Sequence, residues 1–236
     1  TLHDYANRRQ LTVATKLLVF SDKPIIEIAS ICGYESQQSF TTAFKAMYKT
    51  APAQYRDKGC FYPLQLRFTL HQKQSAEKYT LHQIQLALFS DIPAWMDLMR
   101  LVIDGYPVMN ETEYLENLKG SILEKRALVL KDGPVLIGAL AFSRSPGSID
   151  FLGIHPQYRN CGIQKLFLNA LLLIYLPGQD ISTTTYRKGD KADTGYRNML
   201  LKLGFSEREL LTEYGYPTQR FVYQSRHGEE EDHASP

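Results

Sequence analysis

The sequence predicts a multidomain α+β protein, with an all-α helix-turn-helix unit followed by a mixed α/β domain. Apolar residues in the first 56 positions recur at helical spacing, whereas from residue 79 onward strand-like apolar runs alternate with helical patterns. The charge divides at the same place, because residues 1–78 hold 11 Lys and Arg against 6 Asp and Glu, and the remainder hold 16 against 19. Two parts with different partners are therefore expected, and the basic part is a candidate for binding nucleic acid.

Composition narrows the class of protein further. The chain has 236 residues, 44% of them hydrophobic, which is enough to bury a core. Cys32, Cys60 and Cys161 form no CxxC pair and have no neighbouring His pair, which argues against a disulfide framework or a metal site. No basic-then-apolar leader is present, and the longest apolar stretch, residues 166–176, is shorter than the roughly 20 residues of a membrane span. We expect a cytoplasmic protein with no metal and no membrane partner.

The front part is predicted to hold a long helix and then a helix-turn-helix. The long helix is indicated by an i, i+3, i+6, i+7 pattern of Leu11, Ala14, Leu17 and Leu18. Further on, Pro24 suits a first helical position, Gly33 ends that helix, and Ser36 caps the next. Gln37 and Gln38 then open this helix on its outer face, as in a recognition helix for the major groove. Periodicity alone favours a plain three-helix unit with a polar face over a DNA-binding unit.

The residue string favours the DNA-binding interpretation. "IIEIASICGYESQQSFTTAFKAMYKTAPAQYR" resembles the second helix-turn-helix of AraC-type transcriptional regulators, and "LHDYANRRQLTVATKLL" is similar to the linker helix that precedes it. The resemblance covers residues 1–58, with the Gly, the aromatic pair and the closing P-x-x-Y-R in register. It implies base contacts from Gln37, Gln38 and Thr41 and phosphate contacts from Lys45, Lys49 and Arg56.

Two departures from that family predict weak DNA binding. The family carries two helix-turn-helix units, and this sequence starts within the linker helix of the second. Thr42 also stands where close relatives tend to have an Arg. With half of the family's DNA-contacting surface and fewer cationic side chains, the expected affinity for DNA is lower. Residues 59–78 are expected to form a linker, with a strand at 61–70 packed on either part, and residues 226–236 an acidic disordered tail.

The back part is predicted from alternating patterns. Pro93 lies in the first turn of one helix, and Asp132-Gly133 is typical of a hairpin turn. An apolar stripe through Leu166, Phe167 and Ala170 marks the central helix. The expected order is strand 79–88, helices 91–104 and 111–125, a hairpin at 126–144, strand 148–156, helix 162–176, strand 181–186, helix 194–203 and a strand pair at 204–225.

The junction "HPQYRNCGIQKL" is the candidate binding site of the back part. A strand precedes it and an amphipathic helix follows, so the loop directs unpaired amide N–H groups and the positive end of the helix dipole to one point. Such a point binds phosphate, and Gly162 lets the backbone approach the anion. The competing interpretation is a tight turn with a surface Arg159.

The strings "DFLGIHPQYRNCGIQKLFLNAL" and "LLKLGF", with the order of elements, resemble the GNAT acyltransferase superfamily, whose signature is Q/R-x-x-G-x-G/A. The resemblance spans residues 79–225 and implies a GNAT fold that binds acetyl-CoA, with its pyrophosphate on the loop amides and its pantetheine along the strand. The implied cofactor-binding residues are Leu152, Ile154, Arg159, Asn160, Cys161, Gly162, Ile163, Gln164, Lys165 and Thr194.

Attack of an amine on a thioester needs a base and an acid. Asp150 is the candidate base, because it lies two and four residues before Leu152 and Ile154 and is expected on the same strand face; the competing role is a solvated carboxylate. The family's usual acid position holds Leu200, so Tyr196, one turn earlier, is the candidate acid, with Tyr186 as an alternative. A structural role at the core edge is the competing interpretation for both tyrosines.

Three functions are compatible with these residues. The favoured one is an N-acetyltransferase of a small amine or an amino terminus, fused to a DNA-binding element. The second is a regulator whose GNAT-like domain senses acetyl-CoA or a small amine without turnover. The third is a DNA-binding regulator with a scaffolding back part. Asp150 and the Arg159-x-x-Gly162 spacing favour the first two, while Leu200 and Gln164, which replaces the second Gly or Ala of the loop, keep the second open.

Overall fold

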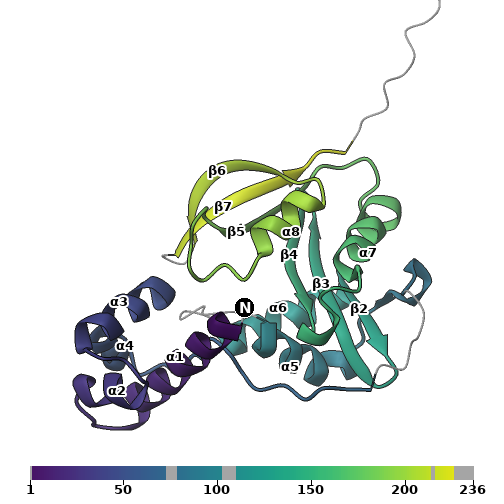
Figure 1. The fold of residues 1–236 in the computed structure, drawn as a ribbon. Helices are drawn as coiled ribbons and strands as arrows, with labels where there is room; N and C mark the ends of the chain where they lie inside the picture. The colour runs from purple at the N-terminus through teal and green to yellow at the C-terminus, as the bar shows by residue number, and fades with distance from the viewer. Residues whose placement is uncertain (1, 73–78, 103–109, 214–215, 226–236) are drawn as a thin grey trace, which may run out of the picture.

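The computed structural model describes residues 2–72, 79–102, 110–213 and 216–225, so the predicted tail lies outside the described residues. Four helices form the N-terminal unit, gathered to one side of the sheet (Figure 1). They are α1 (Leu2–Phe20), α2 (Ile25–Ile31), α3 (Gln37–Tyr48) and α4 (Pro52–Lys58). Aromatic rings fill their core, with Phe44 stacked on Tyr48 at 4.6 Å and edge-on to Tyr55 at 5.4 Å. These rings supply the apolar area that holds the four helices together.

The predicted helix-turn-helix is present as α2 and α3. Gly33 takes a left-handed conformation (φ +81°) after α2, which costs a residue without a Cβ little. Ser36 caps α3 by accepting a hydrogen bond from the N–H of Ser39. Lys49 ends α3, also in the left-handed region (φ 56°). Local capping chemistry therefore sets both helix ends where the sequence placed them.

The segment after α4 packs on the helical unit without forming the expected strand. Leu64 is buried in the helical core, and the Thr12 hydroxyl accepts hydrogen bonds from the N–H groups of Leu64 and Gln65. Further along, the N–H and C=O of His71 pair with the side-chain amide of Gln157. Because a single hydroxyl and a single amide satisfy these backbone groups, the segment needs no partner strand.

A seven-stranded sheet forms the second part, in the order β1-β2-β3-β4-β5-β7-β6. The strands are β1 (Gln85–Leu86), β2 (Ala127–Asp132), β3 (Val135–Arg144), β4 (Gly147–Ile154), β5 (Ile181–Tyr186), β6 (Ser206–Glu213) and β7 (Tyr216–Tyr223). Neighbours are antiparallel except β4 and β5, which run parallel. The strand predicted at 79–88 is reduced to the two residues of β1.

Helices cover both faces of the sheet. On one face, α5 (Ile92–Val102) and α6 (Glu111–Leu123) enclose a core with Trp95 and Ala139. On the other, α7 (Ile163–Ala170) and α8 (Tyr196–Lys202) pack with Phe142 and Phe167. The helix predicted through residue 176 changes after α7 into a π-helical turn, Leu171–Tyr175. The fold class is therefore as predicted, an all-α unit followed by a mixed α/β domain.

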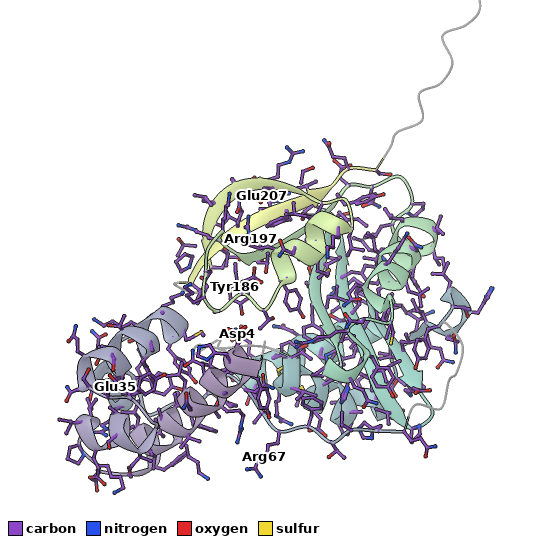
Figure 2. All side chains as sticks on the ribbon, in the orientation of Figure 1. Asp4, Glu35, Arg67, Tyr186, Arg197 and Glu207 are labelled. Carbon is purple, nitrogen blue, oxygen red and sulfur yellow. The ribbon has the colours of Figure 1, made fainter. Side chains whose placement is uncertain are left out.

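The two parts meet at the segment between β5 and α8, residues 187–195. Ala192 from this segment is buried in the helical core, and its carbonyl accepts a hydrogen bond from Arg8 at 2.7 Å. Tyr186, at the end of β5, packs against the same core and lies between the two parts in Figure 2. Side chains of the α/β domain thus complete the hydrophobic core of the helical unit.

Candidate functional site

The parallel strands β4 and β5 separate soon after they start. Their ladder is limited to the pair Ser148 and Ser182, supplemented by side-chain bonds from Ser182 to Gly147 C=O (3.3 Å) and from Thr183 to Ile149 C=O (3.1 Å). Beyond this point both strands run on in the same direction without pairing. The carboxyl end of β4 therefore has one open edge, on the side of β5, and its N–H and C=O groups there need other partners.

A cavity of about 660 Å³ occupies this opening and reaches through the sheet, because its lining comes from helices on both faces. Its charged and aromatic lining includes Glu113, Tyr114, Asp150, Tyr196, Glu213 and Tyr216. Among the described lining residues there is no Lys, Arg or His. Carboxylates beside tyrosine rings attract an organic cation and disfavour an anion.

Asp150 lines this cavity, but not in the way the sequence predicted. The β3–β4 register shifts between Ala141 and Phe142, so Asp150 lies in a β-bulge that breaks the alternation of strand faces. Leu152 and Ile154 pack in the core with α7. Asp150 instead accepts hydrogen bonds from the hydroxyls of Ser143 (2.7 Å) and Ser148 (2.6 Å), which pair with each other where β3 ends and β4 begins. The prediction that Asp150 shares a face with Leu152 and Ile154 is wrong, because the bulge adds one residue to β4.

Tyr196 is held at the open edge of β4. Asp193 accepts hydrogen bonds at 2.8 Å from the N–H groups of Gly195 and Tyr196, which fixes the start of α8. The Tyr196 hydroxyl then donates to the carbonyl of Leu152 at 3.0 Å. Leu200, one turn later, is buried and lines the same cavity. Of the predicted site, Asp150, Leu152 and Tyr196 thus surround one cavity, which Tyr186 also lines.

The predicted phosphate loop follows β4 at its open end. Gly162 adopts φ +74° and precedes α7, and a Cβ built on it would meet no atom within 4 Å. The first bond of the helix ladder joins Leu166 N–H to Gly162 C=O, so the amides of Ile163, Gln164 and Lys165 precede the ladder. The Gln164 side chain donates to the Arg159 carbonyl at 3.2 Å and so folds along the loop. The geometry fits a diphosphate on three helix-start amides.

Other predicted cofactor residues lie outside the cavity lining. The N–H of Cys161 donates to Tyr158 C=O at 3.0 Å, so it belongs to the turn and is not one of the amides left over by α7. Arg159 and Asn160 are exposed on the loop, Ile154 is buried, and Thr194 is exposed just before α8. Within the cavity lining, the predicted cofactor set contributes Leu152.

His155 links β4 to the loop in a buried position. Burial, together with nearby His71 and Arg159, lowers the pKa of His155 below its usual value. Its Nδ1 accepts a long hydrogen bond, 3.4 Å, from the N–H of Gln157, which requires that nitrogen to be unprotonated. A neutral His155 therefore stabilises the start of the loop.

Arg197 was not singled out from the sequence, although its position three residues before the apolar Leu200, on the same face of α8, is a signal for it. It is 6% exposed and donates to Tyr186 C=O (2.9 Å), Gln219 (2.6 Å) and Glu207 (2.5 Å). These bonds join α8 to β5, β6 and β7, and Figure 2 shows Arg197 between Tyr186 and Glu207. Arg197 thereby fixes the wall of the cavity that carries Tyr196.

The helix-turn-helix surface divides the predicted DNA contacts into two groups. Gln37, Gln38 and Lys45 are exposed along α3, and Thr41 is half-buried beside them. Arg56 instead donates to the carbonyls of Leu18 (3.2 Å) and Lys23 (2.6 Å), and Lys49 pairs with Asp190 at 2.8 Å. The structure gives Arg56 a role in joining α4 to the α1–α2 turn, which differs from the predicted phosphate contact.

Comparison with known proteins places the first 58 residues. They match the model of a helix-turn-helix domain family over residues 1–58. They are 41% identical over 59 residues to the probable transcription factor PqrA of Proteus vulgaris and 38% identical over 58 residues to the regulatory protein SoxS of Escherichia coli K12, each covering 25% of this chain. The match spans 48% and 54% of those two relatives, and 23% of the probable transcriptional regulator LumQ of Photobacterium leiognathi, 38% identical over 56 residues. The AraC-type helix-turn-helix indicated by the sequence is confirmed.

Solved structures similar to the back part are GNAT-family acetyltransferases. The ribosomal-protein-S18-alanine N-acetyltransferase of E. coli is 14% identical, with a TM-score of 0.49, and covers 62% of this chain and 96% of its own. A GNAT-family acetyltransferase of Streptococcus agalactiae is 19% identical, with a TM-score of 0.48, over 61% of this chain and 95% of its own.

The described residues contain neither a membrane-spanning helix nor a cluster of metal-ligating side chains. Across residues 2–72, 79–102, 110–213 and 216–225, no helix is long and apolar enough to cross a membrane. Within the same ranges, no group of three or more His, Cys, Asp or Glu side chains is arranged to hold a metal ion.

Proposed function

We propose that this chain is an acetyl-CoA-dependent N-acetyltransferase of a small amine or an amino terminus, joined to an AraC-type DNA-binding unit. The observation that carries the proposal is the open edge of β4, where the cavity and the Gly162 loop meet the same strand. A parallel pair that separates after one ladder position exposes backbone acceptors to an extended ligand. The loop at the carboxyl end of that strand offers amides to the ligand's phosphates.

The donor fits the loop and the strand. Acetyl-CoA brings a diphosphate for the loop and a thioester that an amine can attack. The amides of Ile163, Gln164 and Lys165 bind the diphosphate, with Arg159 adding positive charge at the loop. The pantetheine pairs with β4 at Leu152, whose carbonyl the Tyr196 hydroxyl now occupies. When the donor binds, the Leu152 carbonyl therefore loses its hydrogen bond from the Tyr196 hydroxyl and accepts one from the pantetheine instead.

The acceptor fits the cavity. An amine reaches the enzyme as an ammonium ion, and the carboxylates and tyrosine rings of the lining attract it. Asp150, which accepts hydrogen bonds from two serine hydroxyls and lies 3.9 Å from Arg126, anchors the ammonium and accepts its proton. Tyr196, at the strand edge where the thioester lies, protonates the leaving thiolate.

The test is a panel of primary amines incubated with acetyl-CoA while thiol release is measured. The matched control for each amine is its quaternary trimethylammonium analogue, which keeps the positive charge but has no nitrogen lone pair. Release with the primary amine, above the rate without amine and the rate with the analogue, is expected. Equal rates in all three mixtures, with acetyl-CoA bound by calorimetry, would refute catalysis and leave binding.

The second candidate is a regulator whose α/β domain binds acetyl-CoA or an amine as a signal. The specific observation in its favour is that Tyr196 is committed to Leu152 while Leu200 occupies the family's usual acid position. In that case calorimetry detects binding, no amine releases thiol, and the ligand changes the affinity for DNA. For either function, DNA binding through α3 is expected to be strongly salt-dependent, because it depends on cationic side chains that contact phosphates.

A further inference from the structure

Asp190, in the segment between β5 and α8, gathers donors from both parts of the molecule. Its Oδ1 accepts from the Lys49 ammonium (2.8 Å) and from the N–H of Ala192 (2.8 Å), and its Oδ2 accepts from the Tyr216 hydroxyl (3.0 Å). The Asp190 side chain is only 6% exposed, and the Lys49 ammonium lies 5.6 Å from the centre of the Tyr216 ring. We call Lys49, Asp190 and Tyr216 the clasp.

Lys49 belongs to the surface that α3 offers to DNA. Gln38, Thr42, Lys45 and Lys49 follow one another at i, i+4, i+7 and i+11, so they form one stripe along the helix. The first three are exposed polar or cationic side chains that point away from the helical core. Lys49 ends the stripe at the carboxyl end of α3, where its ammonium also donates to Ala46 C=O at 2.7 Å and turns toward the α/β domain.

We propose that Asp190 competes with a DNA phosphate for Lys49, so that the closed clasp restrains DNA binding by α3. The proposal rests on the DNA-binding part of the proposed function. A carboxylate and a phosphate oxygen are the same kind of acceptor for an ammonium ion. Asp190 is fixed by Tyr216 and Ala192 and nearly buried, so it cannot follow Lys49 to a phosphate. Lys49 has to leave one acceptor to reach the other.

The clasp also connects the DNA-binding unit to the cavity. Tyr216 and Tyr186 line the cavity, and Asp193, three residues after Asp190, caps the helix that carries Tyr196. Coupling between two sites acts equally in both directions. DNA that draws Lys49 away therefore alters the support of the cavity wall, and a cavity ligand that shifts Tyr216 alters the release of Lys49.

The test uses the full chain and a short random-sequence duplex, followed by fluorescence anisotropy over a range of salt concentrations. Asp190→Asn removes the charge that holds Lys49 and keeps the shape of the side chain. Tighter binding of about two- to fivefold at low salt is expected, the range of a partly exposed ion pair. The plot of log affinity against log salt should steepen by about 0.9, as for one added phosphate contact.

The Lys49→Gln background separates the clasp from a general charge effect. In that background Asp190→Asn should give no gain, because there is no ammonium to release. An equal gain with and without Lys49 would overturn the proposal, since it would reflect only the loss of a negative charge. Tyr216→Phe, which removes one hydrogen bond to Asp190 and retains the ring, should give a smaller gain than Asp190→Asn and none in the Lys49→Gln background.

Lys45→Gln, which removes an exposed cation of the same stripe, is the control for DNA binding itself. If the wild type binds and Lys45→Gln weakens it while Asp190→Asn has no effect, the clasp proposal alone fails. If the wild type and every variant show no binding at low salt, the DNA-binding function fails and the clasp with it. Should Asp190→Asn not fold by circular dichroism, Lys49→Gln is compared with Lys45→Gln. A smaller loss for Lys49→Gln supports the clasp, and an equal loss overturns it.

Discussion

Replacing Gly162 tests whether the loop that precedes α7 binds the diphosphate of coenzyme A. At φ +74° an L-residue is strained by roughly 1–2 kcal/mol, while the absence of any atom within 4 Å of the added Cβ means that no clash adds to it. The melting temperature of Gly162→Ala should therefore fall by about 2–8 °C. In the proposed complex, the same methyl group lies where the diphosphate approaches the amides. Displacing one amide–phosphate hydrogen bond costs about 1.5–3 kcal/mol, so the dissociation constant for coenzyme A should rise roughly 10- to 150-fold.

Gly178 supplies a matched control for this experiment. It has φ +71°, and a Cβ added there also meets no atom within 4 Å, but it lies in the turn that follows the π-helix. Gly178→Ala should lose the same stability as Gly162→Ala and keep its affinity for coenzyme A. Isothermal titration calorimetry measures the affinity, and thermal unfolding followed by circular dichroism measures the strain.

One result for Gly162→Ala and Gly178→Ala would refute the binding of a diphosphate by the Gly162 loop. If both alanine variants bind coenzyme A as the wild type does, the helix-start amides do not hold its diphosphate. Gly162→Asn adds a further check, because asparagine tolerates the left-handed conformation and so separates strain from obstruction. We expect it to be more stable than Gly162→Ala and still to bind coenzyme A weakly.

Four further outcomes follow from the site. Asp150→Asn should reduce turnover with an amine by roughly 10²-fold or more and leave coenzyme A affinity within about twofold; an unchanged rate would place the base elsewhere. Tyr196→Phe frees the Leu152 carbonyl, so coenzyme A should bind about two- to tenfold tighter while turnover falls; unchanged affinity would argue against a pantetheine on β4. Arg197→Met leaves Glu207 and Gln219 without their hydrogen-bond donor, so the free energy of unfolding measured by urea titration should fall by about 2–4 kcal/mol. A loss below about 1 kcal/mol would contradict the role of Arg197 in joining α8 to the strands. The folded-state pKa of His155 is depressed below 6.5, so as the pH falls the unfolded chain takes up the proton first. The stabilisation by neutral His155 is therefore fully present above about pH 6.5, and the free energy of unfolding falls below that pH by at most about 1.4 kcal/mol per pH unit. This fall should be smaller in His155→Gln.

The elements predicted from local patterns were largely found where expected. The Ser36 cap and Gly33 turn set the helix-turn-helix, and the Asp132-Gly133 turn joins β2 to β3 as predicted. These features depend on residues within a few positions of one another, so a single sequence contains all the information they need. The expected strand at 61–70 did not form, because the Thr12 hydroxyl, some 50 residues away, takes the place of a ladder.

The candidate site was predicted less completely. The sequence predicts site roles for Asp150, Leu152 and Tyr196, and the structure places all three around one cavity. The face of Asp150 was wrong because a β-bulge, which depends on the pairing of β3 with β4, interrupts the period of two. Arg197 was missed because its partners come from three strands that only the folded sheet brings together.

The sequence by itself determined the order of helices and strands, the caps and turns between them, and the presence of a glycine loop after the fourth strand. Those properties follow from backbone sterics and from hydrogen bonds between near neighbours. Only the tertiary structure decided that Lys49 faces Asp190 across 141 positions of the chain, and that Tyr196 closes the free edge of β4. Such contacts depend on where separate elements dock, and docking is fixed by the packing of whole cores, to which each residue contributes only a small part.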